Sequence, residues 1–208
     1  MKKLVFIFVF FCYFMNGAKA QLNVVWDSIY GTSATERAEC YQKTKDKGFV
    51  FCGYKSDMNN GKYNVIKTDS TGKVEWNKTY GGSGSDWAMS ICTTFDNGFV
   101  VAGFSDSKDG DVSNNNGGRD YWIIKLDSVG NIKWSKVYGG SLDDKPQSVI
   151  ATQDSGYVVI GNTKSNDKDI HGNHGISGSL DVWVLRLDMN GDTLWTKCYG
   201  GKNYDNAY

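Results

Sequence analysis

Two polar loops carry aspartates at alternate positions, a spacing that can hold a hard metal ion. Residues 109–117, DGDVSNNNG, align with residues 167–175, DKDIHGNHG, in the pattern D-x-D-[VI]-x-x-N-x-G. Carboxylate, amide and carbonyl oxygens are the ligands that Ca²⁺ takes in proteins, although the pattern lacks the bidentate glutamate of an EF-hand. Asx-turns alone would also order such a loop. The candidate ligands for calcium, or for another molecule that binds these loops, are Asp109, Asp111, Asn115, Asp167, Asp169 and Asn173.

The only histidines of the chain, His171 and His174, lie in the second of these loops. Histidine together with carboxylates can bind a transition metal. On an irregular loop, however, the H-x-x-H spacing fixes no ligand geometry. We therefore expect both histidines to be solvated loop residues.

The aspartates do not form a recognisable catalytic set. The chain has no G-x-S-x-G, H-E-x-x-H or P-loop motif. A glycosidase needs only two carboxylates, but the aspartates here recur at fixed positions of a repeat, which favours a structural role. The recurring positions are Asp86, Asp144 and Asp205, and Asp69, Asp127 and Asp188. An active site needs an asymmetric set, and the residues found in one copy only are Trp87, Arg119, His171 and His174.

Tryptophans mark the repeat that positions these residues. They start the motif W-x-x-x-Y-G at intervals of 50, 58 and 61 residues, at Trp26, Trp76, Trp134 and Trp195. Each complete copy then contains a turn and an apolar run, namely DKGFVFCG (46–53), DNGFVVAG (96–103) and DSGYVVIG (154–161). Self-similarity of this length decides the fold before any single motif does.

Each copy is predicted to contain four strands. In the middle copy they cover residues 88–95, 98–105, 121–127 and 132–138. Gly and Asn in the short segments between them favour hairpin turns. Four-stranded units that repeat at this length are typical of β-propeller blades. We therefore predict an all-β fold, a β-propeller with four-stranded antiparallel blades.

The chain is predicted to hold three full blades, an unpaired strand at 23–30 and a truncated fourth blade. The repeats run over approximately 26–75, 76–133, 134–194 and 195–208, within a partial propeller at 21–208. Propellers close with about four to eight blades. We therefore expect an open arc that is the N-terminal fragment of a longer protein, whose remaining blades are its partners.

One end of the predicted units collects the variation in length. The loops between the second and third strands, which cover 55–62, 106–119 and 164–180, are long and polar. A meander places them at the same end as the segments that cross to the next unit. Binding residues gather on such variable loops, so we expect function at this end.

Residues 1–20 have the pattern of a signal peptide. Lys2 and Lys3 precede an apolar run over 4–15, and Ala18-Lys19-Ala20 fits signal peptidase, so we predict cleavage after Ala20. No second apolar run of membrane length follows, so we expect a secreted or cell-surface chain without membrane insertion. Without residues 1–20 the net charge is −3, and no basic patch suggests nucleic acid.

Four cysteines follow the predicted cleavage site, and two of them flank one hairpin. Cys40 and Cys52 could face each other across it and form a disulfide, or all four cysteines could be small buried thiols. A series of cations, Lys67, Lys125 and Arg186, precedes the turn between the third and fourth strands. These cations could stack on tryptophan, but we expect them to be exposed strand residues.

The run SDSKDGDVSNNNGGRDYWIIKLDSVGNIKWSKVYGGSLDD (105–144) resembles the repeats of secreted β-propeller proteins that are typical cargo of type IX secretion. The resemblance covers essentially all of residues 26–208. It implies delivery through a C-terminal sorting domain, for which this chain shows no segment. The segments KTDSTGKVEW (67–76) and KLDSVGNIKW (125–134) also resemble the docking segment of quinoprotein repeats. That second resemblance implies an eight-bladed propeller, without a recognisable quinone site.

The sequence thus favours an exported, non-catalytic β-propeller module that binds or scaffolds at the cell surface through its long loops. The expected partners are a glycan or a surface protein, and no cofactor is expected other than the calcium considered above. The alternative is part of a polysaccharide-acting or quinoprotein-like enzyme whose active residues lie in blades outside this chain. A third interpretation is a spacer that presents other domains.

Overall fold

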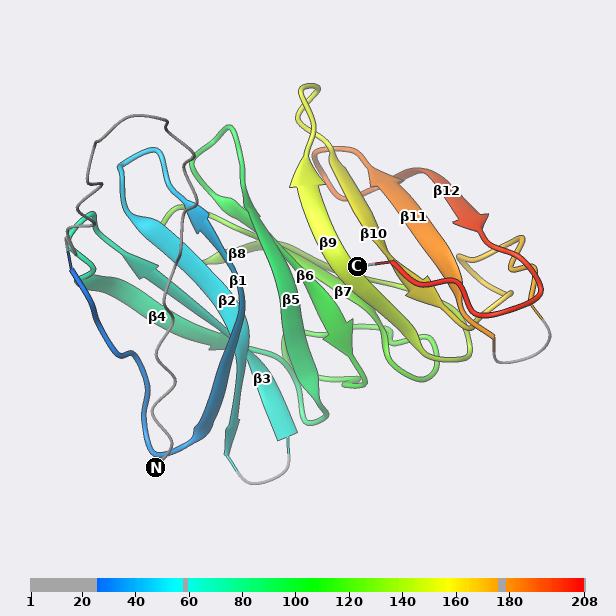
Figure 1. The fold of residues 1–208 in the computed structure, drawn as a ribbon, viewed down its shortest axis with the longest axis horizontal. Helices are drawn as coiled ribbons and strands as arrows, with labels where there is room; N and C mark the ends of the chain where they lie inside the picture. Colours follow the sequence, from blue (N-terminus) through cyan, green and yellow to red (C-terminus); the bar gives the residue numbers. More distant parts are fainter. Residues whose placement is uncertain (1–25, 58–59, 176–178, 208) are drawn as a thin grey trace, which may run out of the picture.

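The computed structural model describes residues 26–57, 60–175 and 179–207, and in these ranges it is all-β (Figure 1). The predicted signal peptide lies outside the described residues. The first sheet comprises β1 (Thr35–Lys43), β2 (Phe49–Asp57), β3 (Asn60–Thr68) and β4 (Val74–Tyr80). The second comprises β5 (Asp86–Thr93), β6 (Phe99–Ser105), β7 (Asp120–Leu126) and β8 (Ile132–Tyr138). The third comprises β9 (Asp144–Ala151), β10 (Tyr157–Thr163), β11 (Asp181–Leu187) and β12 (Thr193–Tyr199).

Each sheet is an antiparallel meander, with its four strands paired in chain order. The strands of the second sheet lie within two residues of the bounds predicted from the sequence. The three sheets lie side by side in chain order, from blue through green to red (Figure 1). The described residues contain no helix long and apolar enough to cross a membrane.

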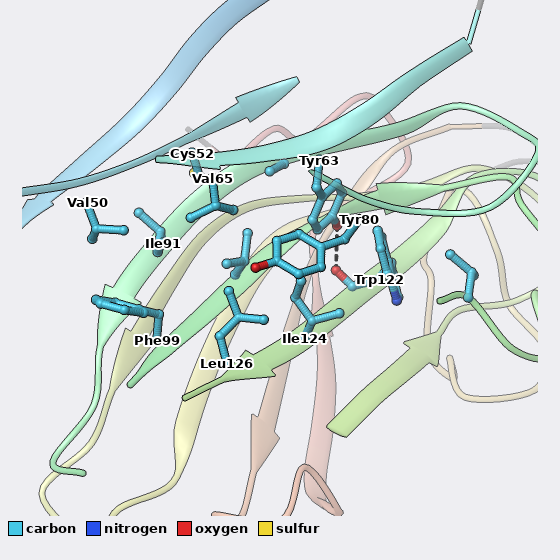
Figure 2. Close-up of a cluster of buried hydrophobic side chains, with 13 residues drawn as sticks. Val50, Cys52, Tyr63, Val65, Tyr80, Ile91, Phe99, Trp122, Ile124 and Leu126 are labelled. Carbon is cyan, nitrogen blue, oxygen red and sulfur yellow. Dashed lines mark hydrogen bonds between the residues drawn. The ribbon is translucent and has the colours of Figure 1, made fainter. Parts of the chain in front are cut away.

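Two apolar cores lie between neighbouring sheets. The middle sheet is buried on both faces, so the side chains of β6 and β7 alternate between the two cores. Phe99 and Trp122 face the first sheet, whereas Val100 and Tyr121 face the third. Figure 2 shows the first core, in which Tyr63 and Val65 of the first sheet meet Trp122 and Leu126 of the second. This double burial explains why β6 and β7 are apolar without interruption.

The fourth strands of the first and second sheets each contact the next sheet through one tryptophan and one tyrosine. Trp76 packs edge-on against Phe99, with ring centroids 5.9 Å apart, and Trp134 packs against Tyr157 at 6.0 Å. The Tyr80 hydroxyl donates a hydrogen bond to the Gly130 carbonyl oxygen over 2.7 Å. Tyr138 donates to Gly191 in the same way. The W-x-x-x-Y motif is therefore the contact that joins one sheet to the next.

The predicted N-terminal strand is not present in its described part. Residues 26–32 form no strand, although Trp26 packs against Phe49 at 5.8 Å and Tyr30 donates a hydrogen bond to the Gly72 carbonyl oxygen. These are the contacts that fourth strands make elsewhere. The segment lies on the face of the first sheet, so no described strand pairs with its backbone and no ladder forms.

Two of the three cations of the third strands are buried and Arg186 is partly buried, so the expectation that they are exposed is wrong. Lys67 is 3% and Lys125 is 6% exposed. Lys67 donates to the Asp46 carboxylate over 2.7 Å, and Lys125 donates to Asp96 over 2.9 Å. Arg186 forms the same pair with Asp154. Each cation thus ties the third strand to the turn between the first and second strands of its own sheet.

Candidate functional site

The crossing between two sheets is organised around one buried aspartate. The first crossing (81–86) ends at Asp86, whose Oδ2 accepts a hydrogen bond from the Gly82 N–H over 2.9 Å. The second crossing (139–144) ends at Asp144, whose Oδ2 accepts from the Gly140 N–H over 2.8 Å. Hydroxyl groups at the end of the second strand of the same sheet, and just after it, also donate to each carboxylate. The recurrent aspartates therefore hold the crossings, as the sequence predicts.

The Asp-x-Asp loops (109–117 and 167–175) are fastened to these crossings. Asp109 Oδ1 accepts a hydrogen bond from the Ser83 N–H over 2.5 Å, and Asp111 Oδ2 accepts from the Gly81 N–H over 3.0 Å. The second loop repeats the arrangement, with Asp167 accepting from Ser141 over 2.8 Å and Asp169 from Gly139 over 3.0 Å. The alternating spacing thus places two carboxylates on alternate backbone N–H groups of the crossing, and the N–H between them donates to the buried Asp86 or Asp144.

The asparagines of the same pattern order the loop itself. The Asn115 side chain donates to the Ser105 carbonyl oxygen over 2.8 Å and accepts from the Gly117 N–H over 3.1 Å. Asn173 makes the corresponding contacts with Thr163 and Gly175, and it also donates to the Ser165 carbonyl oxygen. The apolar residue of the pattern, Val112 or Ile170, is buried in an adjacent core. All six candidate ligands thus form hydrogen bonds with backbone groups that hold the loops and crossings in place.

This arrangement weakens the case for calcium within the Asp-x-Asp loops. The four carboxylates already accept backbone N–H groups, and an Asx-type clamp accounts for the pattern without a metal. Among the described residues, no group of three or more His, Cys, Asp or Glu side chains is placed to hold an ion. Calcium at these loops stays a hypothesis.

The two histidines have different surroundings. His171 is exposed at the surface of the second Asp-x-Asp loop. The His174 ring Nδ1 lies 2.8 Å from Asp181 Oδ2, and its side chain is 51% exposed while Asp181 is fully buried. His174 therefore lies beside a buried carboxylate instead of being fully solvated.

Two of the residues that occur in one copy only, Trp87 and Arg119, meet in an aromatic cluster. Tyr54 stacks on Trp87 with ring centroids 4.3 Å apart, and Trp87 contacts Phe104 at 5.5 Å. The Arg119 guanidinium carbon and the Lys145 ammonium nitrogen each lie 5.4 Å from the centroid of the Phe104 ring. We call these five residues the aromatic–cation cluster. It joins all three sheets at their loop-bearing end.

Sequence reasoning singled out Trp87 and Arg119 but missed the other three members. Tyr54 and Phe104 stand at equivalent positions of β2 and β6, and Lys145 is the residue of β9 that corresponds to Trp87. The third sheet has Asn162 where the others have an aromatic ring. These differences between the aligned copies are visible in the sequence and could have indicated the other three members of the cluster.

The cluster has a positive edge. Burial lowers the pKa of Lys145, and the nearby Arg119 and Lys164 lower it further. Arg119 lies 4.0 Å from Asp106 and Lys164 lies 3.8 Å from Asp143, which balances part of the charge. A cavity of about 430 Å³ opens on the same end, lined by Lys55, Asn60, Lys62, Thr79, Gly82 and Ser83. Half-buried rings beside cations can hold a ring-shaped, negatively charged ligand.

Comparison with known proteins gives no independent assignment. No family model matches the chain, and no curated protein matches its sequence. The described arrangement of three four-stranded sheets and its aromatic–cation cluster therefore carry the argument about function.

Proposed function

We propose that this chain is part of a secreted β-propeller that binds an acidic glycan at the cell surface. The binding site is the aromatic–cation cluster of Tyr54, Trp87, Phe104, Arg119 and Lys145. One observation carries the proposal. Residues that differ between the copies come together in one cluster, and this cluster lies at the end of the sheets that bears the long loops.

The repeated junction supports the propeller arrangement. The fourth strands of the first two sheets pack on the following sheet through the same tryptophan and tyrosine contacts, as repeated blades of a propeller would. On β12 the equivalent Trp195 and Tyr199 are 43% and 52% exposed. A further blade would cover them as the second sheet covers Trp76 and Tyr80.

The chemistry of the cluster favours an acidic sugar over a neutral one. Aromatic faces bury the apolar face of a sugar ring, and Trp87 and Tyr54 are each only half buried. Arginine binds carboxylate or sulfate groups in bidentate geometry. Arg119 and Lys145 supply two cations on one ring. Export of the chain, which the signal-peptide pattern of residues 1–20 favours, would bring this site to extracellular polysaccharides.

A glycan array with the mature secreted protein tests the proposal, followed by titration of the strongest acidic hit. We expect Trp87→Ala and Arg119→Gln each to weaken binding about tenfold or more, which corresponds to about 1.4 kcal/mol. Phe95→Ala is the matched control, because Phe95 is an exposed aromatic residue in the turn between β5 and β6, at the opposite end of the sheet. Circular dichroism checks that each variant is folded.

Two results would overturn the proposal. Binding that survives both cluster variants would place the site elsewhere. Consumption of the bound glycan, measured as new reducing or unsaturated ends, would instead favour the polysaccharide-acting enzyme.

A further inference from the structure

The third strands of the three sheets differ at one position, which is partly buried in the first sheet and fully buried in the other two. Lys62, Asp120 and Asp181 each precede the residue that pairs with Tyr54, Phe104 and Asn162 respectively. They are therefore equivalent in register. The first sheet has a cation at this position, and the other two have a carboxylate.

At the first crossing, the cation completes the surroundings of Asp86. Asp86 Oδ2 accepts three hydrogen bonds, from the Gly82 N–H at 2.9 Å, the Ser107 hydroxyl at 3.1 Å and the Lys62 ammonium at 3.3 Å. The same ammonium donates to the Gly84 carbonyl oxygen over 3.1 Å. A positive charge thus lies between a buried carboxylate and a backbone carbonyl.

At the second crossing, two neutral donors of the same kind are present, but a carboxylate stands in place of the cation. Asp144 Oδ2 accepts from the Gly140 N–H at 2.8 Å and the Ser165 hydroxyl at 2.9 Å. Where the first crossing has Lys62, the second has the carboxylate of Asp120, which is fully buried. Within the described part of the chain, Asp120 Oδ1 has no hydrogen-bond partner.

The third crossing (200–205) also has a carboxylate oxygen that is unpartnered in the described ranges, but here the His174 ring Nδ1 lies 2.8 Å from the other oxygen of the same carboxylate, Asp181 Oδ2. Asp181 is fully buried, and its Oδ1 also lacks a hydrogen-bond partner among the described residues. A β-carbon built on Gly200 would lie 2.6 Å from Asp181 Oδ1 and 2.8 Å from Asp205 Oδ2. The two carboxylates therefore converge beside the same glycine.

We propose that Ca²⁺ binds between Asp120 Oδ1 and Asp144 Oδ2, and between Asp181 and Asp205, in the place that the Lys62 ammonium fills at the first crossing. A buried carboxylate oxygen without a donor is costly unless a cation meets it. The pair of Lys62 and Asp86 is neutral, and two carboxylates become neutral with one divalent ion. The Leu142 carbonyl aligns with that of Gly84, which accepts from Lys62, and is therefore the candidate for a further hard oxygen ligand.

The acid pairs are separate from the Asp-x-Asp loops. Asp109 and Asp167 each accept a backbone N–H of a crossing at Oδ1, whereas Asp120 Oδ1 and Asp181 Oδ1 have no donor among the described residues. Asp120 and Asp144 are both fully buried, and two like charges at such a place without a counter-ion are costly. A bound divalent ion removes that cost.

Calorimetry and thermal melting of the mature protein, first treated with EDTA and then titrated with CaCl₂, test the proposal. The wild-type protein should bind one Ca²⁺ per acid pair and melt at a higher temperature with Ca²⁺. Asp120→Lys places a cation beside Asp144, as Lys62 lies beside Asp86 at the first crossing. This variant should remain folded and bind one Ca²⁺ fewer than the wild type. The double variant Asp120→Lys/Asp181→Lys should lose all Ca²⁺ binding.

Two further variants separate the possible outcomes. Lys62→Asp should create a third acid pair and add one bound ion. Asp109→Asn/Asp167→Asn should bind Ca²⁺ as the wild type does, and Asp120→Asn repeats the loss if a lysine variant does not fold. If the wild type shows no Ca²⁺ response, the acid pairs are neutralised by a shared proton and not by an ion. If Ca²⁺ binding is lost only in Asp109→Asn/Asp167→Asn, the ion binds in the Asp-x-Asp loops. Either result overturns the proposal.

Discussion

Cys40 on β1 lies directly opposite Cys52 on β2, beside a bulge in the ladder between the two strands. Both thiols are free in the structure. A hydrogen bond from Cys52 lowers the pKa of Cys40 to about 6, although burial opposes this shift. The equivalent pair in the second sheet is Ser90 and Ala102, so two facing cysteines occur in the first sheet only.

We predict that Cys40 and Cys52 form a cross-strand disulfide when the protein is incubated with glutathione disulfide. Cys40 is the attacking thiolate at neutral pH, because its pKa lies below 7. Peptide mapping under non-reducing conditions should find this pair linked, with Cys92 and Cys198 still free. The double variant Cys40→Ser/Cys52→Ala reproduces the second sheet and should fold without the bond. A linkage of either residue to Cys92 or Cys198 would contradict the register.

Substitution of Gly103 should be strongly destabilising. A β-carbon there would lie 2.0 Å from the Trp87 carbonyl oxygen and 2.5 Å from the Tyr63 hydroxyl, which itself donates to Trp122. Gly103→Ala therefore forces the first two sheets apart, at a cost of about 1–3 kcal/mol or more. Urea denaturation measures the loss. Gly201→Ala is the control, because its nearest neighbour would be 4.0 Å away, and equal losses in the two variants would refute the steric argument.

The tyrosines of the fourth strands should contribute to stability only where a following sheet is present. Tyr80→Phe leaves the buried carbonyl of Gly130 without its donor, and the expected loss of unfolding free energy is about 1–3 kcal/mol. Tyr199→Phe changes a residue that is 52% exposed and should change stability by less than about 0.5 kcal/mol. Thermal melts of the described three-sheet chain test the difference. In a longer chain with a further blade, Tyr199→Phe should become as costly as Tyr80→Phe.

Acid should destabilise the protein through the carboxylates of the turns. Burial opposes the shift, but hydrogen bonds from Lys67 and Thr44 lower the pKa of Asp46 to about 2, and Thr94 and Lys125 do the same for Asp96. In the unfolded chain these groups titrate near about 3.9. The stabilisation is therefore complete above pH 4 and is lost as the pH falls towards 2. Urea melts between pH 2 and 5 should show a shallower slope for Asp96→Asn than for the wild type.

Local sequence features predicted the strands well. The hairpin turns depend on residues that are neighbours in the chain, such as Asp127 and the N–H of Asn131, and the alternation along β6 and β7 marks their two buried faces. The number of strands per unit and their bounds therefore follow from a single repeat. The unpaired N-terminal segment was the exception, because a strand exists only when another strand lies beside it.

The candidate site was harder to predict because its contacts are distant in sequence. Asp109 accepts from Ser83, 26 residues earlier, and Lys67 pairs with Asp46, 21 residues earlier. Without those partners in view, the aspartates suggested a metal site and Lys67 suggested a solvated strand residue. The aligned copies show Lys62 in the first sheet where Asp120 and Asp181 stand in the others. The sequence does not show, however, that these residues lie beside the buried aspartates Asp86 and Asp144 of the crossings.

The junction between sheets gives the chain a direction. The fourth strand always supplies the tryptophan and the tyrosine hydroxyl, and the next sheet always supplies the ring and the glycine carbonyl. A segment cut between consecutive tryptophans therefore carries half of each of two interfaces. Removing or duplicating such a segment would keep the tryptophan and tyrosine contacts of the junction, but it would change the aromatic–cation cluster, whose members differ between the copies. For the junction contacts, the natural borders of the units lie inside the interfaces, in the W-x-x-x-Y segments, and not at the crossings that separate the sheets.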